Sequence, residues 1–127
     1  MISVVIPSLG GDLCDTLDSV NAGSICPDEI IVCLPNDTHS VKDALKYKNL
    51  VVVYAEQYGQ VYQRIVGFKH AKGDYVLQLD DDIFIDRGCL EQLIASLQEL
   101  PTPSTVSPCV FNTNDRPLYE RKKDGLL

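Results

Sequence analysis

The sequence predicts an α/β fold in which a mostly parallel sheet is covered by helices on both faces. Two observations lead to this prediction: apolar, β-branched runs alternate four times with segments of helical periodicity, and the connections between them are short. The chain has 127 residues, of which 45% are hydrophobic and 23% are charged. This size and composition suit one globular domain over residues 1–127.

The first half of the chain contains three predicted strands and two predicted helices. Residues 2–7, ISVVIP, form an uninterrupted apolar run, which is typical of a strand buried on both faces. A helix is expected within residues 11–23, where apolar residues recur at helical spacing. Two more strands are expected at residues 28–34 and 49–56, with a short helix between them at residues 38–47.

The second half contains one more predicted strand between two helices. A helix is expected over residues 60–72, and Gly73 is placed to end it. Four apolar residues at helical spacing should form the buried face of this helix: Val61, Ile65, Phe68 and Ala71. The fourth strand is expected at residues 74–79, and the last helix at residues 88–100.

Charge and cysteine content exclude several classes of partner. Eleven basic and eighteen acidic residues give a net charge of −7, which argues against a nucleic-acid partner. The five cysteines form no CxxC pair, so free thiols in a reducing cytoplasm are expected instead of a zinc site. The sequence has no transmembrane stretch and no signal peptide. We therefore expect a cytoplasmic protein, and the basic run at residues 121–123 leaves a weak, peripheral contact with anionic lipid at the inner face of the membrane as an alternative.

Three adjacent carboxylates, Asp80, Asp81 and Asp82, follow the fourth predicted strand. In open parallel sheets, ligands bind beyond the carboxyl ends of the strands. Asp80 and Asp82 are two residues apart, so on an extended backbone their side chains point to the same side. Carboxylate oxygens are ligands that Mg²⁺ and Mn²⁺ prefer, and such a metal could neutralise a bound diphosphate. A solvated acidic turn that binds nothing is the alternative that the spacing leaves open.

Three stretches of the chain resemble the nucleotide-binding half of family 2 glycosyltransferases, which have the Rossmann-like GT-A fold. They are residues 2–10 (ISVVIPSLG), residues 28–37 (DEIIVCLPND) and residues 58–82 (YGQVYQRIVGFKHAKGDYVLQLDDD). In the longest stretch, a glycine turn precedes a helix with an Arg and a Gly, and a KGDY-like turn precedes an apolar strand that ends in the DxD motif. The matching residues before that motif are Gly59, Arg64, Gly67, Gly73, Asp74 and Tyr75. The resemblance covers roughly the first hundred residues and implies the donor half of a longer glycosyltransferase domain.

The resemblance also implies roles for individual residues. Asp82 would be the main metal ligand, and Asp80 would contact the ribose or share the metal. Asp81 completes the nucleotide-sugar-binding motif between them. Pro7 and Ser8 would line the uracil pocket at the end of the first strand.

Two residues of the helix over 60–72 have more than one interpretation. By the resemblance, Arg64 would face the nucleotide or brace the carboxylates, and a structural salt bridge at the sheet edge is the alternative. Gly67 matches the family motif, but close packing of the helix on the sheet is its preferred interpretation.

The sequence departs from the family pattern in three places. Leu34 and Pro35 stand where the family carries an acidic pair that binds the uracil ring, so Asp37 could serve only if the loop shifts. The helix has the sequence QRI where ARN is usual. No catalytic base is assigned, because the late acidic residues lie in no recognisable context: Asp115, Glu120 and Asp124.

The resemblance implies an inverting glycosyltransferase of polysaccharide biosynthesis. It would transfer sugar from a nucleotide-diphosphate donor, with a UDP-sugar favoured, to a glycan or lipid-linked acceptor, assisted by Mn²⁺ or Mg²⁺. A nucleotide-diphosphate binding module without turnover is the alternative. A nucleotidyltransferase is less favoured, because residues 7–15 carry no basic side chain to hold a triphosphate. A purely structural domain would leave the aspartates unexplained, and a homodimer formed through the sheet edge is also open.

Overall fold

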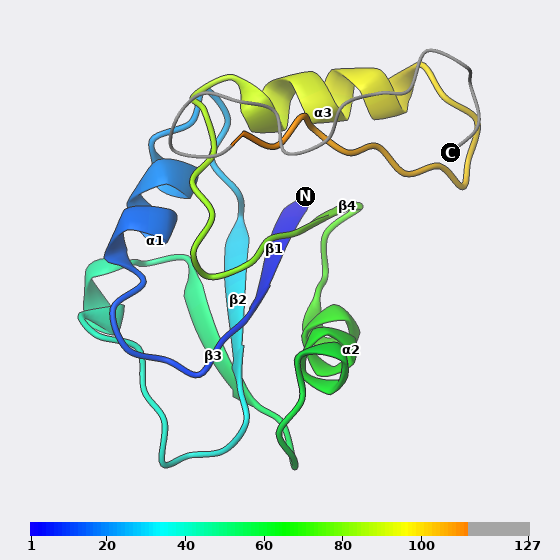
Figure 1. The fold of residues 1–127 in the computed structure, drawn as a ribbon. Coiled ribbons are helices and arrows are strands. Elements are labelled where there is room, and N and C mark those ends of the chain that lie inside the picture. Colours follow the sequence, from blue (N-terminus) through cyan, green and yellow to red (C-terminus); the bar gives the residue numbers. More distant parts are fainter. Residues whose placement is uncertain (112–127) are drawn as a thin grey trace. The chain divides into compact units, whose positions relative to one another are not determined.

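The computed structural model describes residues 1–111 of the chain. Residues 1–91 form one compact unit, and the residues from 92 onward belong to a second, so each is described by itself. Within the first unit, four strands alternate with helices (Figure 1). The helix α3 (Cys89–Gln98) begins in the first unit and continues in the second, and no further helix follows it within the described residues.

The four strands form one parallel sheet in the order β3-β2-β1-β4. Their bounds are Ile2–Pro7 for β1, Glu29–Leu34 for β2, Leu50–Tyr54 for β3 and Tyr75–Gln78 for β4. At the centre, Val4 of β1 pairs with Ile30 of β2 on one side and with Leu77 of β4 on the other. β4 lies at an edge of this sheet, and every second residue of it is exposed. The predicted α/β fold with a parallel sheet is confirmed.

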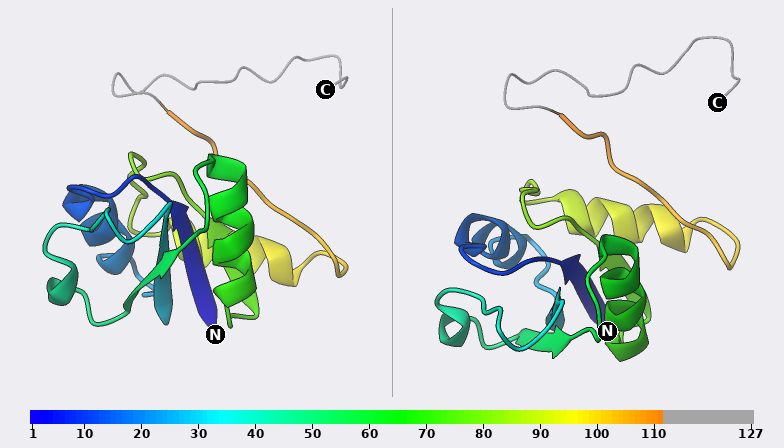
Figure 2. Two further views of the ribbon diagram at one scale, coloured as in Figure 1. Left: turned by 90° about the horizontal axis from the view of Figure 1, so that it is seen from below. Right: turned by 60° about the horizontal axis from the view of Figure 1, so that its bottom comes forward.

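Helices cover both faces of the sheet, as Figure 2 shows for α1 (Cys14–Asn21) in blue and α2 (Gln60–His70) in green. Because side chains alternate along a strand, neighbouring residues of β1 belong to different cores. Val4 packs in one core with Leu17 of α1, whereas Val5 packs in the other with Val66 of α2.

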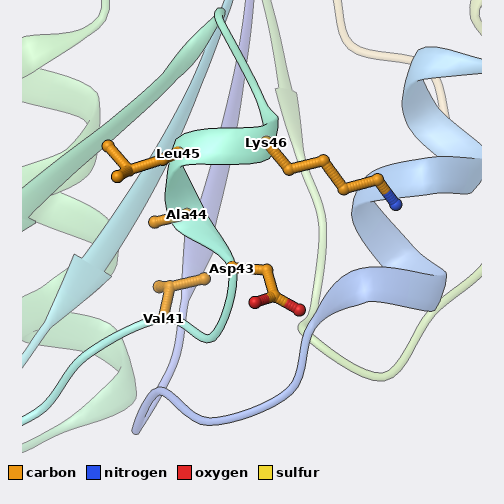
Figure 3. A pocket seen from close by; sticks show the side chains of 5 residues that line it. All are labelled: Val41, Asp43, Ala44, Leu45 and Lys46. Carbon is orange, nitrogen blue, oxygen red and sulfur yellow. The ribbon is translucent and has the colours of Figure 1, made fainter.

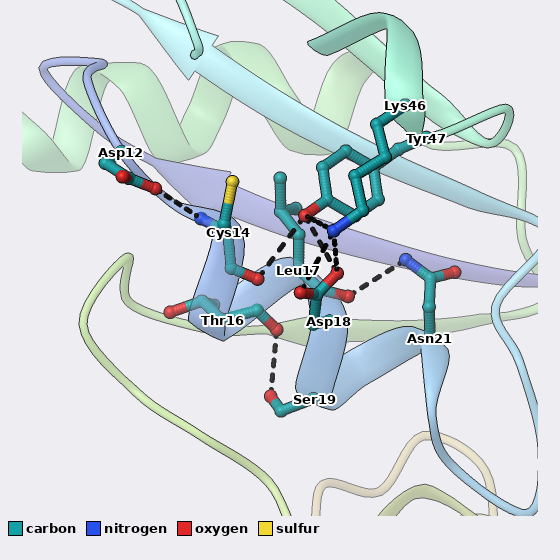
Figure 4. Close-up of polar contacts among 9 residues, drawn as sticks. All are labelled: Asp12, Cys14, Thr16, Leu17, Asp18, Ser19, Asn21, Lys46 and Tyr47. Atoms are coloured by element: carbon teal, nitrogen blue, oxygen red, sulfur yellow. Dashed lines mark hydrogen bonds and ion pairs between the residues drawn. The ribbon is translucent and has the colours of Figure 1, made fainter. Parts of the chain in front are cut away.

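The helix expected at residues 38–47 is only a short 3-10 turn, η1 (Ala44–Lys46). Asp43, directly before it, has a left-handed backbone with φ of 53°, which interrupts a longer helix. Polar contacts join this turn to α1 (Figure 4): Lys46 Nζ lies 3.0 Å from Asp18 Oδ1, and the Tyr47 hydroxyl donates to the same oxygen at 2.9 Å. Asp18 thus holds η1 against α1.

α2 turns a different face to the sheet from the one that the apolar spacing predicts. Its buried residues are Gln63 and Gly67. Three residues of the predicted face are instead exposed, namely Val61 at 68%, Ile65 at 46% and Phe68 at 44%. Of that face, Ala71 alone packs against the core.

The close approach of α2 to the sheet depends on Gly67. A Cβ atom at this position would overlap with Cγ1 of Val5 on β1. The interpretation of Gly67 as a packing residue is therefore confirmed. The prediction for Gly73 is wrong, since α2 ends at His70 and Ala71 is its C-cap.

A buried carboxylate joins three segments at the amino edge of the sheet, where the strands begin. Glu29 accepts hydrogen bonds from the Ser3 hydroxyl at 2.6 Å and from the Lys72 backbone N–H at 2.8 Å. The Gly73 N–H donates to the same Ser3 hydroxyl oxygen at 2.8 Å. Burial opposes ionisation of Glu29, but the two hydrogen bonds outweigh it and lower the pKa of Glu29 below its usual value. This cluster ties the segment that leads into β4 to the first residues of β1 and β2.

Two further expectations concern thiols and membranes. All five cysteines are free, as the sequence predicts. Within residues 1–111, no helix combines the length and the apolar character that a membrane crossing requires. The prediction of a single domain over residues 1–127 stays a prediction.

Candidate functional site

The strand order creates a switch point at the carboxyl edge of the sheet, where the strands end. From β1 the chain moves outward through β2 to β3, and it then returns to place β4 on the other side of β1. In open parallel sheets, such a reversal opens a crevice for ligands between the two strands concerned. Here those strands are β1 and β4, so the residues that follow them, Ser8 and Asp80 to Asp82, lie at the expected position of a ligand.

A hydrogen-bond network joins the loops that follow β1 and β4. The Ser8 hydroxyl donates to Oδ2 of Asp81 at 2.6 Å, and it accepts from the Gly10 N–H at 2.9 Å. On the other side, the Thr16 hydroxyl of α1 donates to the backbone carbonyl of Asp81 at 2.9 Å. Both Ser8 and Thr16 are buried, so Asp81 is held by its side chain and by its backbone.

Asp80 has an ionic partner on α2. The Arg64 guanidinium lies 2.6 Å from Oδ1 of Asp80, and the two side chains are 23% and 43% exposed. Nε of Arg64 is buried and has no partner within the described residues. In this structure Arg64 is paired with Asp80, which fits both a brace for this carboxylate and the structural salt bridge that the sequence left open, and a contact with a nucleotide stays a prediction.

Asp82 differs from the two residues before it. Its side chain is exposed, and no hydrogen bond or ion pair joins it to another residue in the described part of the chain. Adjacent like charges repel one another unless partners stabilise them. Arg64 and Ser8 provide such partners for the first two aspartates, and Asp82 presents its carboxylate to solvent.

The site contains the donor atoms for a metal that binds together with a nucleotide. Within residues 1–111, no group of three or more His, Cys, Asp or Glu side chains is placed to hold a metal ion. Mg²⁺ bound with a nucleotide needs only one or two protein carboxylates, because phosphate and water complete its octahedron. Asp80 and Asp82 are two carboxylates of this kind, and they lie at a turn over residues 81–82 instead of on the extended backbone that the sequence suggested.

The residues expected to bind the base are only partly brought together. Pro7 and Ser8 are buried at the end of β1. Asp37 is exposed, and no hydrogen bond or ion pair joins it to another candidate residue in the described part of the chain. The neighbouring amide of Asn36 donates instead to the Tyr58 hydroxyl at 3.3 Å. The loop after β2 therefore directs Asn36, not Asp37, toward the loop after β3.

The sequence did not indicate two residues of this network, Gln63 and Thr16. Gln63 is 3% exposed, and its Nε2 donates to the carbonyl oxygens of Ser8 and Cys33. No pattern in the sequence singles out Gln63, because it lies off the apolar face predicted for its helix and its hydrogen-bond partners are distant in sequence. The late acidic residues Asp115, Glu120 and Asp124 lie outside the described residues.

A surface hollow lies at η1 (Figure 3). It is lined by Val41, Asp43, Ala44, Leu45 and Lys46, and none of the candidate site residues contributes to it.

Comparison with known sequences decides the family. The family model described as Glycosyl transferase family 2 matches residues 3–125 of the chain. The chain belongs to glycosyltransferase family 2. The resemblance seen in the sequence is therefore confirmed, and the match includes every residue of the switch point described above. No curated protein matches the chain.

This chain is similar to solved structures of glycosyltransferases with the GT-A fold. S. aureus TarS 1–349 is 27% identical with a TM-score of 0.64, and the match covers 77% of this chain and 32% of that one. A complex of TarS 1–349 with UDP-GlcNAc is 25% identical with a TM-score of 0.59, and the match covers 77% and 31%. A complex with UDP is 22% identical with a TM-score of 0.63, covers 91% and 43%, and shows the fold alone. The chain thus spans about a third of the first of these structures.

Proposed function

We propose that this chain binds the diphosphate of a nucleotide-sugar donor, with a UDP-sugar favoured, at the carboxyl edge between β1 and β4. The observation that carries the proposal is the arrangement of the three aspartates at the switch point. Asp80 is paired with Arg64, Asp81 is held by Ser8, and Asp82 faces solvent. The UDP-GlcNAc complex of TarS supports a uridine donor, since that protein has the same fold and a related sequence.

Asp80 and Asp82 would hold Mn²⁺ or Mg²⁺ together with the donor phosphates. The bound cation would supply positive charge that stabilises the diphosphate as a leaving group. The chain's own residues prepare this site. Arg64 offsets the charge of Asp80, while Ser8 and Thr16 hold Asp81, so that Asp82 extends from a fixed backbone. Pro7 and Ser8 would border the uracil, with Asp37 close enough to take part only after a shift of its loop.

The proposed reaction is sugar transfer with inversion to a glycan or lipid-linked acceptor. An acceptor hydroxyl oxygen would attack the anomeric carbon, and the bond between that carbon and the diphosphate oxygen would break. The hydroxyl proton would pass to a general base, and the diphosphate would leave with the bonding electrons. We assign no residue of the described part to the role of this base.

A binding module without turnover is the second candidate. It is the alternative because no residue of the described part, residues 1–111, is assigned as a general base. Incubation with UDP-GlcNAc distinguishes the two candidates. Release of UDP, by hydrolysis or by transfer, would support the enzyme, whereas stable binding without release would support the module.

Calorimetric titration of UDP, with and without Mn²⁺, tests the proposed site. We expect binding to require Mn²⁺ and to weaken at least about tenfold in Asp82→Asn, which corresponds to about 1.4 kcal/mol. Asp86→Asn is the matched control, because Asp86 is also exposed and the substitution removes the same charge four residues away. Equal affinity of Asp82→Asn and the wild type, or no heat from the folded wild type, would count against the proposal.

A further inference from the structure

The side chain of Gln63 joins the carboxyl ends of two neighbouring strands. It is 3% exposed, and its Nε2 donates hydrogen bonds to the carbonyl oxygens of Ser8, at 2.8 Å, and Cys33, at 2.7 Å. Ser8 is the first residue after β1, and Cys33 belongs to β2. One buried amide on α2 therefore fixes the two strand ends relative to each other.

Gln63 holds Ser8, which lies beyond the last residue of β1 that pairs with β4. Pairing of β1 with β4 ends where Val5 lies opposite Gln78, and the Leu79 N–H still donates to the Val5 carbonyl at 3.0 Å. Beyond that point, the Ser8 N–H donates to the Cys33 carbonyl at 3.1 Å. The carbonyl of Ser8 relies on Gln63. Buried carbonyl groups need such partners, so the amide sets the orientation of this peptide group.

The orientation of the Ser8 peptide group affects the aspartates, because the Ser8 side chain contacts Asp81. The direction of a side chain follows from the backbone that carries it, and the Ser8 hydroxyl is the donor to Oδ2 of Asp81, at 2.6 Å. The Ser8 carbonyl belongs to the peptide group that leads to Leu9 and Gly10, and the Gly10 N–H donates to the Ser8 hydroxyl oxygen at 2.9 Å. A rotated peptide would withdraw this donor and free the Ser8 hydroxyl from its position against the Asp81 carboxylate. Asp80 and Asp82 share the backbone of Asp81, so their positions also depend on this contact.

We propose that Gln63 is a positioning residue of the donor site. It holds the Ser8 peptide so that Ser8 keeps Asp81 in place between Asp80 and Asp82. This inference rests on the proposed function, the binding of a nucleotide diphosphate at these aspartates.

Two substitutions at Gln63 and one control test the inference by calorimetry with UDP and Mn²⁺. Gln63→Ala removes the amide with a good helix former, and Gln63→Met removes it at similar volume. We expect both to weaken UDP binding roughly tenfold. Glu29→Gln is the control, because it removes a buried charge at the opposite edge of the sheet and should leave UDP affinity unchanged.

A double variant tests whether Gln63 acts through Ser8. If it does, Gln63→Ala should add little to the loss of affinity already caused by Ser8→Ala, since both remove one pathway. A structural role without positioning would lower thermal stability in every background but would leave UDP affinity unchanged. Additive losses of affinity in the double variant, or wild-type affinity in both single Gln63 variants, would overturn the inference.

A measurement without ligand separates this inference from the proposed function. In ¹H–¹⁵N NMR spectra, Gln63→Ala should shift the amide signals of Gly10 and Asp81, while those of Lys72 and Gly73 at the amino edge stay in place. Unmoved Gly10 and Asp81 signals would overturn the inference. A wild type that binds no UDP, but whose signals respond to Gln63→Ala in this way, would refute the proposed function and retain the link from Gln63 to Asp81.

Discussion

Asp80, Asp81 and Asp82 are adjacent residues of like charge, and each lies in a different environment. Arg64 neutralises Asp80, and the hydroxyl of Ser8 donates to Asp81. Repulsion among three carboxylates would otherwise oppose the folding of this turn. These two contacts allow the fold to keep the third carboxylate exposed, where a cation and phosphate oxygens have access to it.

Substitutions of Arg64 test whether its main role is to pair with Asp80 or to contact the nucleotide. Arg64→Met leaves Asp80 without its ionic partner, so we expect the free energy of unfolding to fall by about 1 kcal/mol. Arg64→Lys keeps the charge but not the planar guanidinium, and the loss should be smaller. The midpoint of urea unfolding, compared at an unchanged m-value, measures both effects.

An effect on UDP affinity without an effect on stability would contradict a stabilising role for the pair of Arg64 and Asp80. If Arg64→Met unfolds at the wild-type midpoint but loses UDP affinity, the side chain acts on the nucleotide and its contact with Asp80 contributes nothing measurable to stability. Lys69→Met serves as the control, because Lys69 is an exposed residue of the same helix.

At the scale of the elements, the packing of α2 on β1 depends on Gly67. Gly67→Ala would bring a methyl group onto Val5, and α2 would have to move away from the sheet. We expect a loss of about 1–3 kcal/mol in the free energy of unfolding, larger than the gain of about 1 kcal/mol that alanine brings to a helix. Thermal and urea unfolding measure this loss.

Phe68, the next residue along α2, provides the control for this prediction. Phe68 is 44% exposed, so Phe68→Ala should change the free energy of unfolding by less than about 0.5 kcal/mol. A stable Gly67→Ala variant together with an unstable Phe68→Ala variant would mean that the predicted apolar face, and not the face in this structure, is turned to the sheet.

Glu29 makes the amino edge of the sheet sensitive to pH. Its pKa is lowered in the folded protein, so its ionised form stabilises the fold above the pKa of an unfolded glutamate, and this stability is lost as the pH falls through the lowered value. Glu29→Gln keeps one amide oxygen in place of the Oε1 that accepts from Ser3 and Lys72, but it removes the charge. At pH 7 we expect it to cost about 1 kcal/mol.

Unfolding of the wild type and Glu29→Gln across a pH series measures this contribution. The difference between the two proteins should be constant near neutral pH and should shrink below the usual range of carboxyl groups. A difference that grows as the pH falls would have the wrong sign for a lowered pKa. UDP affinity should not respond, because Ser3 and Lys72 lie at the edge opposite to the site.

Periodicity predicted the strands more accurately than the helical details. β1 and β2 are apolar runs rich in β-branched residues and are buried almost throughout, and such runs leave a clear signal. The face of α2 was missed because glycine and glutamine are not apolar, although Gly67 allows close approach and Gln63 satisfies two carbonyls. Residues 38–47 form only η1, because Asp43 adopts a left-handed backbone that helical spacing does not reveal.

At the scale of the molecule, the position of the site followed from the order of strands and loops. Loops that follow parallel strands gather at one edge, so Ser8 and the aspartates could be placed together from sequence. The pairs Arg64–Asp80 and Ser8–Asp81 and the bridge from Gln63 to Cys33 could not. They join residues on different elements, and each depends on distances that exist only in the folded chain.

Paramagnetic broadening by Mn²⁺ tests most directly whether the switch point is the donor site. With UDP present, we expect Mn²⁺ to broaden the amide signals of residues 79–82 and 8–10, with Mg²⁺ as the diamagnetic reference. The signals of residues 72–74, at the amino edge of the sheet, should stay sharp. Broadening centred on another acidic group, such as Asp12 and Asp18 near η1, or no selective broadening in the folded protein, would contradict this location of the site.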